Sequence, residues 1–177
     1  MSIEELKYPV GKYQRQENIS PEELKNYINE ISNFPARLKA AVQNLSEEQL
    51  DTPYREDGWT VRQVVHHCAD SHMNSLTRLK LALTEDVPVI KPYVEAKWAE
   101  LADSVKMEIA PSIQMIEGIH SRWTVLLHSL TPEEWQRTFI HPQTGRTFRL
   151  DENTGLYAWH CRHHLAHITG LIKRMGW

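Results

Sequence analysis

Hydrophobic residues recur at helical spacing along four long stretches of the chain. The first opens with SPEE, a capping box with proline at the first helical position, and apolar residues follow every three or four positions, which predicts a helix from about 21 to 44. Pro35 should kink or split this helix. A second capping box, TVRQ, opens a long helix over 61–83. The same periodicity predicts helices over 111–130 and about 154–174.

Shorter elements are expected between these helices. The capping box at 46–49 predicts a short turn of helix, and 131–134 repeats the pattern of a capping box with proline. The segment 85–93 carries two prolines and is expected to be a loop. A shorter helix is expected over 94–103. The segment 137–150 alternates weakly around a PQTG turn, which indicates a small β-hairpin.

Four long helices joined by loops predict an all-α fold, a four-helix bundle with short extra helices and the small hairpin near 137–150. The length of 177 residues fits a single domain over 1–177. No apolar run approaches the roughly 20 residues that a membrane-spanning helix needs. The first twenty residues are too polar for a signal peptide, so we expect a cytoplasmic protein without a membrane partner.

Charge and cysteine content narrow the function classes further. Lys and Arg total 20 against 23 Asp and Glu, a formal net charge of -3, and no sustained basic run is present. Nucleic acid is therefore not the expected partner. The two cysteines, Cys68 and Cys161, are too few for a disulfide framework and are expected to be free thiols that act as small core residues.

Histidines cluster in the last predicted helix, where WHCRHHLAHI places four of them within ten residues. Residues four apart on a helix point the same way, one turn apart, so His160 with His164 and His163 with His167 are both pairs that could bind one metal ion. Helical phase places His160 and His164 with apolar residues on the inner face. They are therefore the better pair.

A second histidine block, His66-His67, lies early in the helix over 61–83. If that helix faces the last one, either residue could supply a third ligand, and periodicity does not decide between them. Three imidazoles leave a metal with an open coordination position, which is the catalytic arrangement. A metal in such a site makes hydroxide or thiolate available near neutral pH.

Three segments together resemble the DinB/YfiT-like metalloenzymes over nearly the whole chain: YPVGKY, DTPYREDGWTVRQVVHHCADSHMNSLTRLKLALTED and YAWHCRHHLAHITGLIKRMGW. The resemblance implies a four-helix bundle with one divalent metal on three histidines. In that family the ligands are the second histidine of the HH pair and two histidines four apart in the last helix, which are His67, His160 and His164 here. The family suggests zinc or nickel, and imidazole ligands suit both.

The resemblance implies a metal-dependent hydrolase that acts on a small-molecule substrate and forms a cytoplasmic homodimer. Some relatives are thiol S-transferases, so a transferase that conjugates electrophiles with bacillithiol is the main alternative. A third hypothesis is a non-catalytic binding module whose bundle is stabilised by a structural metal ion. A structural site prefers four ligands, and His163 or His167 would have to supply the fourth.

Other residues near the histidine blocks have more ordinary interpretations. Asp70, three residues after His67, could orient that imidazole or act as a base, but a solvated or ion-paired carboxylate is expected more often. His163 and His167 are expected to be flanking or core histidines, and His72 a core histidine with its hydrogen bonds satisfied.

Two tryptophans and two arginines also adjoin the histidine blocks. Trp59 and Trp159 are expected to pack near the site rather than contact substrate. Arg62 and Arg162 could clamp an anionic thiol cofactor, but ordinary surface arginines are the expected case. No Gly-x-Ser-x-Gly elbow is present, so the sequence gives no sign of a serine hydrolase.

Overall fold

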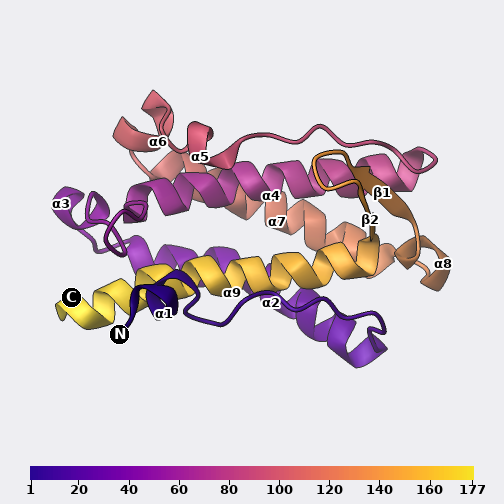
Figure 1. Cartoon of the computed structure of the whole chain (residues 1–177), viewed down its shortest axis with the longest axis horizontal. Helices are drawn as coiled ribbons and strands as arrows, with labels where there is room; N and C mark the ends of the chain where they lie inside the picture. The colour runs from indigo at the N-terminus through magenta and orange to yellow at the C-terminus, as the bar shows by residue number, and fades with distance from the viewer.

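A computed structural model describes all 177 residues, and four long helices run side by side along it (Figure 1). α9 packs against α2 and α4, and α7 packs against the same two helices, so the order around the bundle is α2, α9, α4, α7. The predicted four-helix bundle is confirmed. Its helices are α2 (Pro21–Val42), α4 (Val61–Thr84), α7 (Ala110–Ser129) and α9 (Leu150–Met175).

Short elements join the long helices. They are α1 (Ile3–Lys7), α3 (Glu47–Leu50), α5 (Glu95–Trp98), α6 (Ala102–Lys106) and α8 (Pro132–Trp135), with the antiparallel hairpin β1 (Thr138–His141) and β2 (Arg146–Arg149). The hairpin and the helices at α3 and α8 agree with the sequence predictions. The single helix expected over 94–103 is wrong, because two separate short helices, α5 and α6, lie there. The sequence analysis also missed α1, although Ser2 and Glu5 form a capping box.

Capping boxes fix where several helices begin. The hydroxyls of Ser20 and Thr60 each accept a hydrogen bond from the backbone N–H three residues later, and the side chains of Glu23 and Gln63 accept from the cap backbone in return. These reciprocal bonds satisfy N–H groups that have no partner inside the helix. α2 and α4 therefore begin where the sequence pattern predicts.

Pro35 does not split α2, which continues through it to Val42. Proline has no N–H, so the carbonyl of Ile31, four residues earlier, receives no helical hydrogen bond. The ring of His120 on α7 occupies this position instead, with its Nδ1 2.6 Å from the Ile31 oxygen. The expected split is wrong because a neighbouring helix satisfies the carbonyl that the proline leaves free.

α9 begins at Leu150, four residues before the predicted start. The acidic residues Asp151 and Glu152 lie in its first turn, where carboxylates complement the positive end of the helix dipole. Both are buried, and arginines compensate their charge: Arg149 pairs with Asp151 at 3.0 Å, and Arg15 pairs with Glu152 at 3.1 Å. The pair with Arg15 joins residues far apart in the sequence and is not visible as a local helix signal.

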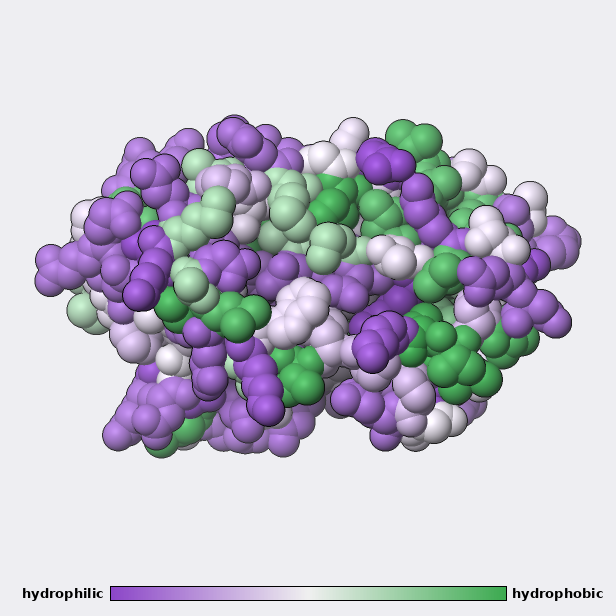
Figure 2. Space-filling view, turned by 90° about the horizontal axis from the view of Figure 1, so that it is seen from above, coloured by the Kyte–Doolittle hydropathy of each residue, from purple (hydrophilic) through white to green (hydrophobic).

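The core lies between the four long helices and is rich in large side chains such as Phe34, Trp123 and Leu127, all almost fully buried. Seen from above, the surface mixes hydrophilic and hydrophobic atoms (Figure 2). None of the helices combines the length and the apolar character that crossing a membrane requires. The packed core fixes the positions of the four long helices. Between α4 and α9 it includes buried histidines from both helices.

Candidate metal centre

His67 from α4 meets His160 and His164 from α9. The Nε2 atoms of His67 and His160 lie 3.3 Å apart, and one nitrogen from each of the three rings lies within 4.8 Å of the others. His160 and His164 are one helical turn apart, with ring centroids 4.3 Å apart. The two histidine blocks that are distant in the sequence are thus brought together.

His66 and His67, between which helical periodicity did not decide, point to different places in the structure. His66 points toward α6 and α7, where its Nδ1 lies 2.8 Å from Ser112 Oγ and its Nε2 lies 3.2 Å from the Met107 carbonyl oxygen. Both nitrogens of His66 are therefore engaged in hydrogen bonds. His67 points toward α9 and packs against Trp59, with ring centroids 4.7 Å apart.

Burial keeps the clustered imidazoles neutral. It lowers the pKa of His67 to about 4 and the pKa values of His160 and His164 well below the usual histidine range. Neighbouring imidazoles lower these pKa values further, since a second positive charge nearby would repel the first. A neutral imidazole has a lone pair free to bind a metal, so the cluster has the protonation state that a metal site requires.

A second group of histidines, His163, His164 and His167, is also close enough to hold a metal ion. His167 stacks on Tyr54 with ring centroids 3.9 Å apart, and its Nε2 donates to the carbonyl of Lys7 at 3.2 Å. Because His164 belongs to both groups, one metal ion would use one set or the other.

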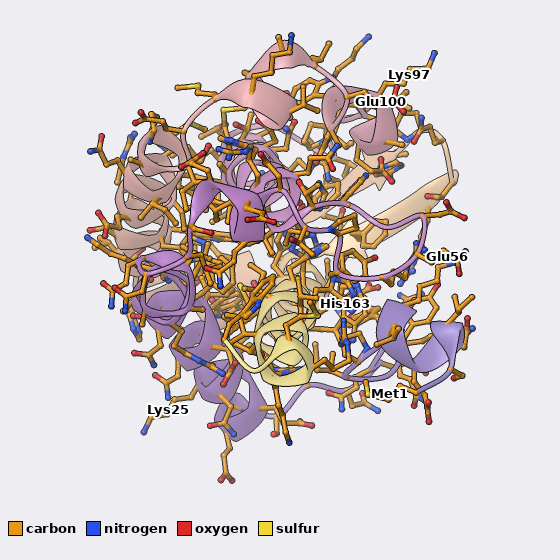
Figure 3. The ribbon with its side chains drawn as sticks, turned by 90° about the vertical axis from the view of Figure 1, so that its left-hand side faces the viewer. Met1, Lys25, Glu56, Lys97, Glu100 and His163 are labelled. Atoms are coloured by element: carbon orange, nitrogen blue, oxygen red, sulfur yellow. The ribbon has the colours of Figure 1, made fainter.

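His163 borders the cluster from the neighbouring position of α9 and packs on Trp159, with ring centroids 4.4 Å apart. Figure 3 shows it between α9 and the N-terminal segment. The ring of Tyr8 lies 6.1 Å from that of His163. The segment around α1 therefore forms a wall of the site, a contribution that the sequence analysis did not anticipate.

A cavity of about 670 Å³ opens from the histidine cluster. Its size falls within the roughly 300–1,000 Å³ that is typical of small-molecule sites. Trp59 and Trp159 line it, so both tryptophans lie at the site, as expected. The sequence analysis missed several further lining residues, because they come from five separate segments and share no motif: Lys7, Tyr8, Tyr54, Arg55, Arg78, Tyr93, Glu95 and His141.

Asp70 makes no hydrogen bond with His67, and its half-buried side chain does not line the cavity. Burial, together with the nearby carboxylate of Asp103, raises the pKa of Asp70 to about 6. Asp70 forms no salt bridge, so of the two ordinary interpretations, a solvated or an ion-paired carboxylate, the ion pair does not form.

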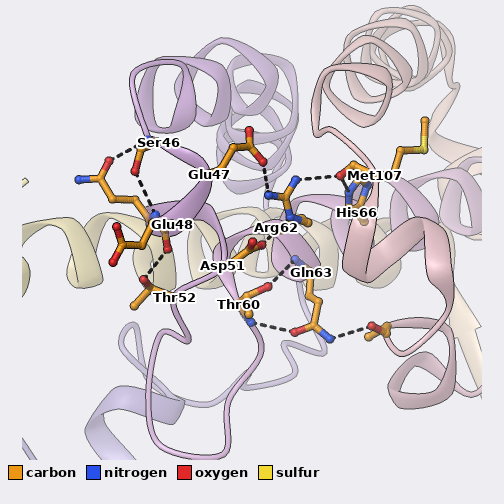
Figure 4. A network of polar contacts seen from close by, with 12 residues as sticks. Ser46, Glu47, Glu48, Asp51, Thr52, Thr60, Arg62, Gln63, His66 and Met107 are labelled. Carbon is orange, nitrogen blue, oxygen red and sulfur yellow. Dashed lines mark hydrogen bonds and ion pairs between the residues drawn. The ribbon is translucent and has the colours of Figure 1, made fainter.

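Arg62 is not the surface arginine that the sequence suggested. Its side chain is only 3% exposed and donates to the carboxylates of Glu47 and Asp51 and to the carbonyl of Met107 (Figure 4). It therefore ties α3 and the end of α6 to α4, and it does not line the cavity. Arg162 lies outside the cavity.

The smaller predictions about cysteine and histidine packing agree with the structure. Cys68 and Cys161 are buried free thiols, and burial raises the pKa of both. They pack in the hydrophobic core rather than at the histidine cluster. His72 is fully buried, and both of its nitrogens have hydrogen-bond partners.

Comparison with known proteins places this arrangement in a family. The model of the DinB superfamily matches residues 30–168, a range that contains both histidine blocks. The chain belongs to the DinB superfamily. YfiT of Bacillus subtilis, named as a candidate metal-dependent hydrolase, is 50% identical over 177 residues, which cover 100% of this chain and 99% of that protein.

A further relative and a solved structure are similar to the same degree. A candidate metal-dependent hydrolase of Bacillus cereus (strain 03BB102) is 53% identical over 175 residues, covering 99% of this chain and 100% of that protein. The solved structure of Bacillus subtilis YfiT, described as an unusual four-helix bundle, superimposes with a TM-score of 0.95 and covers 98% of this chain and 99% of its own. Two relatives that match this chain over nearly its whole length are thus named for metal-dependent hydrolysis, and one of them shares its four-helix bundle.

Proposed function

We propose that this protein is a metal-dependent hydrolase with one divalent metal ion held by His67, His160 and His164. The observation that carries the proposal is the convergence of these three imidazoles at the inner end of a cavity large enough for a small substrate. The relatives named for the same activity support it.

The donor set fits a metal ion. Zinc–imidazole bonds of about 2.0–2.1 Å put two nitrogens of a tetrahedral site roughly 3.3–3.4 Å apart, which is the spacing of the His67 and His160 Nε2 atoms. The buried Nδ1 of His164 has no hydrogen-bond partner within the protein, so this ring is not committed to another contact. We propose zinc or nickel as the ion, since both accept imidazole ligands.

Three protein ligands would leave the metal ion a coordination position for water or substrate, and all three histidines line the cavity. A metal ion bound there would supply Lewis-acid activation of a substrate carbonyl and of a water molecule. The hydroxyls of Ser71 and Tyr157 lie beside it: Ser71 Oγ is 3.5 Å from His160 Nε2 and 3.3 Å from the Tyr157 hydroxyl. The Ser71 hydroxyl can donate a hydrogen bond to a substrate oxygen, whereas the Tyr157 hydroxyl donates to the Ser71 carbonyl at 3.2 Å. The ring of Trp59 packs against His67.

Polar groups around the cavity mouth bear on the substrate class. Lys7, Arg55 and Arg78 line it together with the carboxylates of Asp57 and Glu95. This mixture of signs suits a small polar substrate rather than a polyanion. We also propose that the protein acts in the cytoplasm as a homodimer, which analytical ultracentrifugation of the purified chain would check.

The test is a hydrolysis screen with the zinc-loaded and the nickel-loaded protein. Small esters and amides are offered with and without metal, and the His160→Ala variant is assayed in parallel. Metal-dependent turnover that this variant loses is the expected result. Turnover that is equal with and without metal would contradict the proposal.

The same screen separates the alternatives. Electrophiles are added with bacillithiol, and turnover that needs both thiol and metal would replace the hydrolase by the thiol S-transferase. The third hypothesis predicts no turnover and a protein that unfolds when a chelator removes the metal. Such a result would show a structural metal ion, because a structural metal contributes decisively to folding.

A further inference from the structure

A line of hydrogen-bonded histidines crosses the core behind the proposed metal position. His160 Nδ1 lies 3.0 Å from His72 Nε2, and His72 Nδ1 lies 2.7 Å from His120 Nε2. His120 Nδ1 ends the line 2.6 Å from the carbonyl oxygen of Ile31. The line thus passes from α9 to α4, then to α7 and finally to α2, so that each of the four bundle helices contributes one member.

The backbone carbonyl sets the direction of every bond in this line. A carbonyl oxygen only accepts, so His120 must carry its proton on Nδ1. A neutral His120 then presents a bare Nε2, which accepts from Nδ1–H of His72. His72 in turn presents a bare Nε2, which accepts from Nδ1–H of His160. Nε2 of His160 is consequently left without a proton, and it is this atom that faces Nε2 of His67.

The opposite direction would require a buried positive charge. If His160 carried its proton on Nε2, then His72 would have to donate from Nε2 and His120 would have to donate from both nitrogens. His120 would then be an imidazolium ion, although it is 1% exposed. Its ring contacts are the aromatic side chains of Phe34 and Trp123 and the ring of His72, and no carboxylate compensates it. Burying such a charge without a partner is costly.

Pro35 makes the end of the line available. In an uninterrupted helix the Ile31 carbonyl would accept from the N–H of residue 35, and proline has none. The helix-breaking residue in the middle of α2 therefore has a consequence on the far side of the bundle. It frees the acceptor that fixes the proton position of His120.

We propose that His72 and His120 are positioning residues which, with the Ile31 carbonyl freed by Pro35, hold His160 in the Nδ1–H form and aim its bare Nε2 at the metal. The role of these residues in metal binding rests on the proposed function. The positions of the protons on the three imidazoles do not depend on it. Hydrogen bonds of this kind fix the orientation of a ligating imidazole and raise its basicity.

The first experiment needs no metal, and its decisive spectra are those of the wild type. Long-range proton–nitrogen NMR spectra of the ¹⁵N-labelled, metal-free wild type at neutral pH report which ring nitrogen carries the proton, and single His→Gln variants assign the signals. We expect Nδ1–H with bare Nε2 for His72, His120 and His160. His66 is the internal control, because its Nε2 donates to the Met107 carbonyl and should show the opposite form. A proton on Nε2 of His160, or an imidazolium at His120, would overturn the proposal.

The second experiment measures zinc affinity by competition with a chromophoric chelator. His72→Leu breaks the line beside the ligand, and we expect affinity to fall by about 10–100-fold, as for other partners of metal ligands. His72→Gln should recover most of this loss, because its amide can accept from His160 and donate to His120. His66→Leu, the same change at a buried histidine outside the line, is the matched control and should leave affinity unchanged.

The two experiments separate the possible failures. A wild type that binds neither zinc nor nickel would refute the proposed metal site, while the NMR spectra would still decide the proton positions. Equal zinc affinity of His72→Leu and the wild type would refute the positioning role even in an active metalloenzyme.

Discussion

The Nε2 atoms of His67 and His160 face each other across 3.3 Å between α4 and α9. His160 has its other nitrogen engaged by His72, so the facing atom is free to bind a metal. We predict that His160→Ala weakens zinc binding by more than about 100-fold, since even the loss of a hydrogen-bond partner of a ligand costs about 10–100-fold. Metal analysis after dialysis against a defined zinc concentration measures this.

His167→Ala distinguishes between the two histidine groups that share His164. His167 belongs only to the second group, so we expect this variant to keep its metal while His160→Ala loses it. The reverse result would assign the metal to the group formed by His163, His164 and His167.

The stability of the metal-free protein should fall as the pH decreases from about 6.5 to about 4. Burial lowers the pKa of His120 to about 4 and the pKa of His167 to about 3, whereas an unfolded chain protonates histidine near pH 6.5. The unfolded state therefore binds more protons in this window, and acid favours unfolding. Above about pH 6.5 both states are neutral and this contribution is constant.

Urea unfolding at several pH values, with chelator present, measures the effect. His120 alone accounts for up to about 3 kcal/mol of the loss between these limits. His120→Gln removes one titrating group, so its stability should depend less steeply on pH than that of the wild type. An identical slope in both proteins would mean that His120 has the same pKa in the folded and the unfolded state, so that burial does not depress it.

The parts of the fold that were predictable from the sequence are those encoded locally. Capping boxes and 3.6-residue periodicity placed the starts of α2 and α4 because those signals lie within one helical turn. The start of α9 was not predictable, because buried carboxylates there depend on arginines such as Arg15, far away in the sequence. Pro35 was misjudged for the same reason, since the partner of the Ile31 carbonyl comes from another helix.

The candidate site shows the same division. The four-residue spacing offered two histidine pairs in α9, and helical phase favoured His160 with His164, which the structure brings close to His67. The phase of α4 could not separate His66 from His67, since only the positions of Ser112 and Met107 show where His66 points. The cavity walls were not predictable either, because they combine side chains from segments without a common pattern.

Arg62→Ala should lower the free energy of unfolding by about 1–3 kcal/mol. The buried guanidinium bonds two carboxylates and the Met107 carbonyl, and its loss leaves these groups without their donor. The carboxylates of Glu47 and Asp51 are largely exposed and regain water, which limits the loss. Arg162→Ala is the matched control and should stay within about 0.5 kcal/mol of the wild type in urea unfolding. Equal effects of the two changes would show that Arg62 does not tie α3 to α4.

Two glycines inside helices should respond in opposite ways to alanine. A Cβ at Gly118 on α7 would meet no atom within 4 Å, so Gly118→Ala should raise stability by about 0.5–1 kcal/mol through the lower backbone entropy of the unfolded chain. A Cβ at Gly155 on α9 would lie 2.9 Å from the ring of Tyr27, where α9 packs against α2. The same gain is then offset by overpacking of about 1–3 kcal/mol. Thermal unfolding of both variants measures the difference. Equal stability of Gly155→Ala and Gly118→Ala would show that the Tyr27 ring moves aside without lowering the free energy of unfolding.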